Sequence, residues 1–169
     1  MFKQFWHKRA YRKDLQKSLE SKDLGQKFKI KNINVILDAS LPVDFHFFDE
    51  IAKILTVKKK AINVMTFTST EHTQEEYSLV FDPKEVSFFG TFKGSLQTYC
   101  AQEVDLQINY FDTENLYMNW VASRTSSKLS VGFASVDRKI NDIVFDFSPT
   151  DKELFKNELI KYLKILKRI

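Results

Sequence analysis

A strand, a helix and a second strand follow one another within residues 32–68, and this order restricts the fold more than any other feature. NINVILDAS and INVMTFT are short apolar runs rich in β-branched residues, which is typical of buried strands. Between them, Asp44 can cap a helix that continues to about Leu55 with apolar residues on one face. Two strands joined by a crossover helix form a βαβ unit, so we expect the strands to be parallel.

The same alternation returns in the second half of the chain. Strand patterns DLQINYF, KLSVGF and NDIVFDF surround a helix pattern over residues 113–125, and a last helix runs from Pro149 to the C-terminus. Residues 69–76 are polar and predict a loop, and YSLVF after them predicts an edge strand. The alternation predicts an α/β fold: a single three-layer Rossmann-like domain over residues 32–169, with a mostly parallel sheet and helices on both of its faces.

Residues 1–25 predict a basic, aromatic helix in front of this domain, with Gly25 as its cap. Apolar side chains form two stripes at helical spacing: Phe2, Phe5 and Trp6, then Tyr11, Leu15 and Leu19. At 3.6 residues per turn, the centres of the two stripes point in directions roughly 100° or more apart. We expect the second stripe to dock the helix on the domain, which leaves the three rings of the first stripe facing elsewhere.

Charge is distributed unevenly along the chain. Residues 1–31 contain ten Lys and Arg against three acids, and the last 19 residues carry a net charge of +3. The whole chain is only +4, so the middle is acidic while both ends are basic. Such asymmetry favours an anionic partner for the basic ends.

The basic helix leads to our first functional hypothesis, a non-enzymatic module that binds nucleic acid, with rRNA or the ribosome as its partner. Lys and Arg can pair with phosphates, while exposed aromatic rings can stack on bases. The candidate binding residues are Phe2, Lys3, Phe5, Trp6, Lys8, Arg9, Arg12 and Lys13.

Two alternatives remain open. In the first, the same helix belongs to a peripheral membrane or protein-docking adaptor, with its rings in an interface and its cations over anionic headgroups. In the second, the domain binds a small ligand or catalyses a reaction at the carboxyl ends of its strands, where open α/β sheets place their sites. The candidates there are Asp38, Asp112 and Ser135, although for the two acids we favour a turn or helix cap over a binding role.

Several common sites do not fit this sequence. The glycines at positions 25, 90, 94 and 132 cannot form either GxGxxG or GxxxxGK[ST], which argues against the usual nucleotide loops. His7, His46 and His72 have no metal-binding spacing, and we expect neither a metal nor a cofactor. Cys100 is the only cysteine, so no disulfide forms within the chain, and we expect it to be a buried filler.

No apolar run reaches the ~20 residues of a membrane span. The N-terminus also lacks the apolar run and small-residue cleavage site of a signal peptide. From these patterns we expect a cytoplasmic protein.

Longer stretches resemble a known family. INYFD, the S-K-x-x-V-G-F turn, the R-K-I-N-D segment and the KYLKIL tail are similar to short uncharacterised proteins of Bacteroidota, a domain-of-unknown-function family. The likeness also includes the basic N-terminal helix and the INVILD strand, and so extends over most of the chain. The resemblance implies a single-domain, cytoplasmic protein and brings no known activity with it.

Overall fold

A single parallel sheet organises the computed structural model, which describes residues 1–68 and 78–169. Its strands are β1 (Ile33–Asp38), β2 (Ile62–Phe67), β3 (Ser78–Val80), β4 (Val104–Tyr110), β5 (Ser127–Phe133) and β6 (Ile143–Phe145). They lie in the order β3-β2-β1-β4-β5-β6, and every pair is parallel. The predicted α/β, Rossmann-like fold and the edge strand in YSLVF are confirmed, whereas the predicted loop at 69–76 lies outside the described residues.

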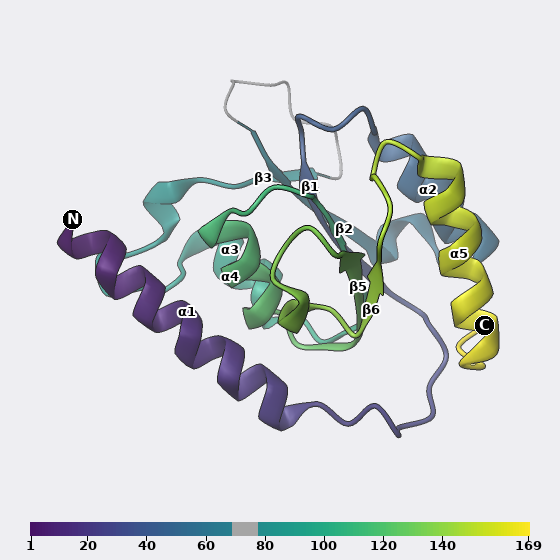
Figure 1. Ribbon diagram of the computed structural model, residues 1–169, viewed down its shortest axis with the longest axis horizontal. Helices are drawn as coiled ribbons and strands as arrows, with labels where there is room; N and C mark the ends of the chain where they lie inside the picture. Colours follow the sequence, from purple (N-terminus) through teal and green to yellow (C-terminus); the bar gives the residue numbers. More distant parts are fainter. Residues whose placement is uncertain (69–77) are drawn as a thin grey trace.

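Helices cover both faces of the sheet (Figure 1). They are α1 (Phe2–Ser21), α2 (Phe45–Ile54), α3 (Gly94–Ala101), α4 (Leu116–Arg124) and α5 (Lys152–Ile165). One apolar core lies between the sheet and the α2 and α5 layer, and a second lies between the sheet and α3, α4 and α1. The chain therefore begins with a helix that belongs to one of the two covering layers.

Aromatic residues dominate the core beneath α2 and α5. Tyr110 is fully buried there, with Phe48, Phe133 and Phe155 at ring-centroid distances of 4.9 to 5.4 Å and nearly perpendicular ring planes. Its hydroxyl group donates to the carbonyl oxygen of Pro149 at 2.6 Å, so the polar end is paired despite burial. Burial raises the pKa of Tyr110 above its usual range.

The opposite face of the sheet carries a buried polar row. Gln107 Nε2 donates to Asn109 Oδ1 at 3.0 Å, and Asn109 Nδ2 donates to Asn141 Oδ1 at 2.8 Å. Asn34 pairs in register with Gln107 on the neighbouring strand and is also fully buried. These bonds offset part of the cost of removing the row from water, while Asn34 Nδ2, Gln107 Oε1 and Asn141 Nδ2 are buried without a partner among the described residues.

Short polar residues set where the helices begin. Asp44 caps α2 as predicted, accepting from the Phe47 N–H at 3.2 Å. Asn115, not Asp112, caps α4, because its side chain accepts from the first-turn N–H groups at 2.9 and 3.2 Å. Asp151 caps α5, so that helix begins at Lys152 instead of Pro149.

Candidate docking surface on the N-terminal helix

The inward face of α1 is centred on His7, which has no exposed surface. Its Nε2 lies 2.8 Å from the carbonyl oxygen of Ser87, and its Nδ1 lies 3.0 Å from the hydroxyl oxygen of Tyr117. A carbonyl oxygen only accepts, so the neutral ring donates from Nε2 and accepts the Tyr117 hydroxyl proton at Nδ1. His7 thereby joins α1 to the loop after β3 and to α4.

Further along α1, polar contacts continue the attachment. Asp14 accepts from the indole N–H of buried Trp120 at 2.7 Å and lies 3.5 Å from the Arg124 guanidinium. Tyr11 donates to Asp137 at 2.7 Å, and burial followed by this hydrogen bond raises the pKa of Tyr11 above its usual range. The helix is thus held by hydrogen bonds in addition to apolar contact.

The predicted docking stripe is only partly correct. Leu15 is buried and Tyr11 is half-buried, but Leu19 is 50% exposed. Residues spaced by four drift about 40° around a helix at each step, so a stripe of three leaves the contact face. The contact face follows His7, Tyr11 and Asp14 instead, and includes Leu15. No sequence signal marked His7, because it stands among cations.

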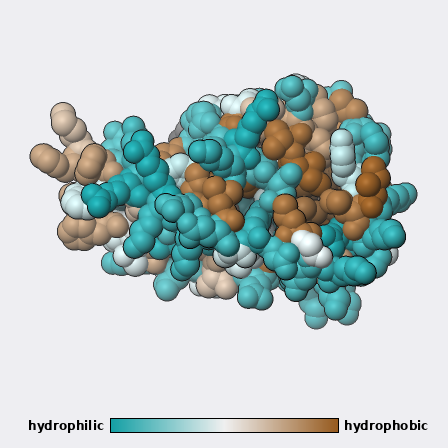
Figure 2. Space-filling model, turned by 60° about the horizontal axis from the view of Figure 1, so that its bottom comes forward, coloured by the Kyte–Doolittle hydropathy of each residue, from teal (hydrophilic) through white to brown (hydrophobic). Residues whose placement is uncertain are grey.

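Five rings form an exposed cluster where α1 begins. We call Phe2, Phe5, Trp6, Phe88 and Phe89 the aromatic tip. Phe2 is 77% exposed, Phe5 59% and Phe89 73%. Trp6 lies 5.9 Å from Phe5 and 6.1 Å from Phe89, and Phe88 lies 5.2 Å from Phe89, measured between ring centroids. Figure 2, which keeps the left–right direction of Figure 1, shows hydrophobic side chains projecting at the end where α1 begins.

Sequence reasoning missed the part of the tip that comes from a turn. Within the turn, Gly90 N donates to the Ser87 carbonyl at 3.0 Å, which places Phe88 and Phe89 at its two corners. Gly90 has φ +88°, and a Cβ atom there would lie 2.7 Å from the Trp120 ring. The turn is therefore fixed against the rest of the molecule. Turn corners favour Gly, Pro, Asn, Asp and Ser, so two phenylalanines there are not what the turn itself requires.

Basic side chains continue from this tip along α1. The exposed ones are Lys3, Lys8, Arg9, Arg12, Lys13 and Lys17. Within residues 1–68 and 78–169, none of them forms an ion pair. Arg9 lies 5.9 Å from the centre of the Trp6 ring, where a cation–π contact is possible. All eight residues proposed for binding on α1 are exposed on this one helix.

Of the three strand-end candidates, one lines a cavity at the carboxyl edge of the sheet. Asp38 lines a cavity of about 480 Å³ at the carboxyl ends of β1 and β2, together with Asn115 and Tyr117. Its Oδ1 accepts from the Ser40 N–H at 2.9 Å, which is the bond of an Asx turn. Asp112 is half-buried and Ser135 is exposed, and neither lines this cavity. Asp38 thus takes part in a local turn, and the other two candidates lie outside the cavity that it lines.

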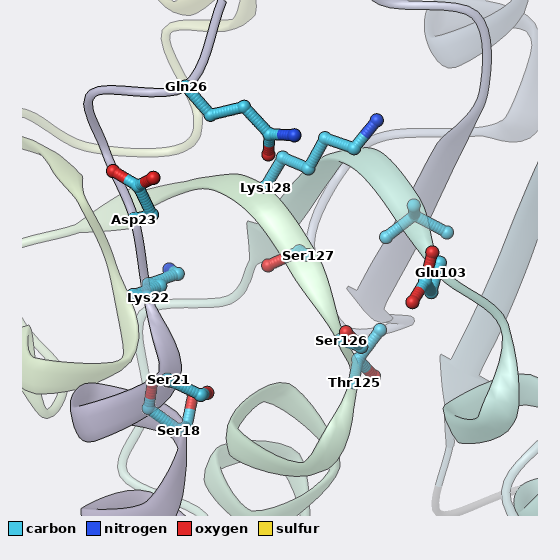
Figure 3. A pocket seen from close by; sticks show the side chains of 11 residues that line it. Ser18, Ser21, Lys22, Asp23, Gln26, Glu103, Thr125, Ser126, Ser127 and Lys128 are labelled. Carbon is cyan, nitrogen blue, oxygen red and sulfur yellow. Dashed lines mark hydrogen bonds between the residues drawn. The ribbon is translucent and has the colours of Figure 1, made fainter. Parts of the chain in front are cut away.

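A second cavity, of about 290 Å³, lies at the amino ends of β4 and β5 (Figure 3). Ser18, Ser21 and Lys22 from the end of α1 line one side, opposite residues 125–128. Both of its lysines are already paired: Lys22 with Asp142 and Lys128 with Asp105. Its cations therefore hold the fold together, and we assign no ligand to this cavity.

The remaining candidates are the Cys100 thiol, a metal site and a membrane-spanning helix. Cys100 is buried, and burial raises its pKa to about 12, so the thiol stays protonated at neutral pH. In the described part of the chain, no three His, Cys, Asp or Glu side chains gather to hold a metal ion. Over the same residues, no helix combines the length and apolar content needed to cross a membrane.

Comparison with known proteins identifies the relatives of this chain. DUF6913, a family of unknown function, matches residues 3–166. The chain belongs to this family. Searches of curated proteins and of solved structures found no match. The DUF6913 match includes nearly all of α1, so the candidate docking helix lies within the family region.

Proposed function

We propose that this chain docks on an anionic membrane surface, with the aromatic tip in the interfacial layer and the cations of α1 over the lipid headgroups. The observation that supports it is the convergence of two distant segments: Phe5 and Trp6 from α1 meet Phe88 and Phe89 from a rigid turn. Contiguous exposed apolar groups rimmed by charge are typical of membrane or partner contacts.

Ring geometry favours a membrane over nucleic acid at this tip. The Phe5–Trp6, Trp6–Phe89 and Phe88–Phe89 ring planes are inclined by 78°, 74° and 82°. Base stacking uses aromatic faces on which successive bases can lie, whereas these edge-on contacts turn neighbouring faces away from one another. Burial in lipid depends on apolar area and imposes no such alignment.

Firm membrane binding requires free energy from both the aromatic tip and the cations of α1. A basic residue close to an anionic leaflet contributes about 1 kcal/mol, so the six cations of α1 contribute about 6 kcal/mol at most. Full burial of a Phe side chain is worth roughly 1.5–3 kcal/mol. Immobilisation of the protein at the surface opposes both terms, so we expect weak binding to neutral vesicles and firm binding to anionic ones.

Co-sedimentation with vesicles tests this function. The protein is mixed with vesicles of phosphatidylcholine alone, or of phosphatidylcholine with phosphatidylserine, and the bound fraction is measured against salt. We expect binding to the anionic vesicles only, and a loss of at least tenfold in affinity for Phe88→Ser/Phe89→Ser. The matched control is Ile54→Ser/Ile165→Ser, which removes two exposed apolar side chains outside the tip and keeps wild-type binding.

Two results contradict the proposal. In the first, the wild-type protein stays in solution with anionic vesicles at low salt. In the second, the tip variant binds them as well as the control variant does. If the tip variant instead loses affinity for a labelled RNA oligonucleotide, the tip belongs to a nucleic-acid site.

A further inference from the structure

The segment between α1 and β1 presents three lysines in a fixed row. Lys27, Lys29 and Lys31 are exposed, while Phe28 packs against the core and Ile30 is buried. This residue-by-residue alternation is that of extended backbone, in which side chains point to opposite sides in turn. Figure 1 shows the segment passing from the end of α1 towards the start of β1. The lysines therefore share the outer side.

Contacts on its inner side hold this segment in place. The Ile30 N–H donates to the carbonyl oxygen of Arg168 at 3.2 Å, and the Lys31 N–H donates to Asp105 at 2.8 Å. Phe28 lies beneath the guanidinium of Arg168, 4.2 Å from ring centre to cation, and Arg168 is itself buried. The C-terminal residues after α5 thus fix the row of lysines that precedes β1.

The positive charges of this row are not neutralised by acidic side chains in the described part of the fold. In the part of the chain that the structure describes, Lys27, Lys29 and Lys31 form no ion pair. The row follows the end of α1 by several residues, so a helix dipole does not account for it either. Exposed Lys58 and Lys60 precede β2, which pairs with β1 from Ile33 onward, and they add charge at the same end of the sheet.

We propose that Lys27, Lys29 and Lys31 form a binding rail for the phosphate backbone of a single nucleic-acid strand. Alternate residues of an extended chain are about 6.6–6.8 Å apart, which is comparable to the separation of successive phosphates along an extended strand. Each lysine then faces one phosphate, and the contacts are sequence-independent. Because α1 is about 30 Å long, the rail and the aromatic tip are separate surfaces at its two ends.

Salt dependence gives this rail a quantitative signature. Binding of a single strand weakens with salt by a log–log slope of about −0.7 for each phosphate neutralised. The variant Lys27→Gln/Lys29→Gln/Lys31→Gln should therefore lower the slope by about 2, measured by fluorescence anisotropy with a labelled oligouridylate. Over a fourfold rise in salt, wild type then loses about 16-fold more affinity than the variant does.

A charge-matched variant separates the rail from general charge. Lys84→Gln/Lys139→Gln/Lys152→Gln removes three exposed lysines elsewhere and should change the slope by less than one unit. Thermal melting checks that both variants fold. The rail is ruled out if wild type does not bind oligouridylate at low salt, or if both triple variants lower the slope equally.

Vesicle binding distinguishes this inference from the proposed function. The rail variant should keep its affinity for anionic vesicles, and the tip variant should keep its affinity for oligouridylate. If the rail variant loses vesicle binding and keeps oligouridylate binding, the rail contacts lipid and the inference is wrong. If the tip variant binds anionic vesicles as well as its control does, while the rail variant lowers the salt slope as expected, only the membrane proposal is wrong.

Discussion

His7 Nε2 lies 2.8 Å from the carbonyl oxygen of Ser87, and this hydrogen bond places the first turns of α1 beside the turn that carries Phe88 and Phe89. The two residues are 80 positions apart in the sequence. The aromatic tip is therefore a product of tertiary structure, and its shape depends on a buried polar contact.

Replacing His7 by Phe should destabilise the protein by about 1–3 kcal/mol. The new ring fills similar space but removes one of the two donors to the Ser87 carbonyl, which keeps only the Gly90 N–H, and it leaves the Tyr117 hydroxyl without its acceptor. Chemical denaturation measures the change in the free energy of unfolding. Tyr117→Phe is the control, because it removes the other partner of His7 and leaves the Ser87 bond intact. A His7→Phe variant as stable as wild type would contradict a stabilising role for the hydrogen bonds of His7.

Asp14→Ala should cost about 1–3 kcal/mol as well. It leaves the indole N–H of fully buried Trp120 unpaired and removes the ion pair of Arg124, whose guanidinium keeps its bond to the Gly90 carbonyl. Equilibrium unfolding in urea measures the loss. Glu20→Ala is the control, because Glu20 is an exposed acid of the same helix that, among the described residues, is bonded to Gln16 alone. Equal losses in the two variants would mean that Asp14 does not anchor α1.

Gly90→Ala should destabilise the turn that carries the tip. Alanine here would have to adopt a left-handed backbone conformation, and its Cβ would lie 2.7 Å from the Trp120 ring. Either Trp120 or the turn must then shift, at a cost of about 1–3 kcal/mol. Gly25→Ala is the matched control, since its Cβ would meet only the Asp23 side chain at 3.2 Å. Thermal melting should show a clearly lower Tm for Gly90→Ala alone, together with weaker vesicle binding.

Cys100 should be unreactive in the folded protein. Burial raises its pKa from 9.0 to about 12, so the thiol contributes stability below pH 9 that is lost as the pH rises towards 12. A thiol reagent at pH 8 should modify the native protein far more slowly than the unfolded one. Cys100→Ser should weaken the loss of stability between pH 9 and 12. Rapid labelling of the native protein would show that the side chain is accessible.

Local patterns were enough to predict the sheet and its crossovers. The strands around α2 were recognisable because burial on both faces requires continuous apolar runs, and Asp44 caps as its position predicts. Such patterns could not predict the aromatic tip or the face of α1 that docks on the domain. Phe88 lies in VSFFGTF, whose pattern fits either a short strand or a loop, and His7 stands among cations, so neither is marked until tertiary contacts bring Ser87 to His7. Asp112 was one candidate cap for the helix after β4, but Asn115, three residues later, offers the same chemistry and caps α4.

Fluorescence of Trp6 tests the membrane proposal most directly, because it reports whether the tip itself enters lipid. Trp120 is fully buried and serves as a constant background, which the Trp6→Phe variant measures separately. On addition of vesicles containing phosphatidylserine, we predict a blue shift of the Trp6 emission and quenching by lipids labelled near the headgroup, both absent in Trp6→Phe. Unchanged Trp6 emission while the protein co-sediments with those vesicles would contradict insertion of the aromatic tip.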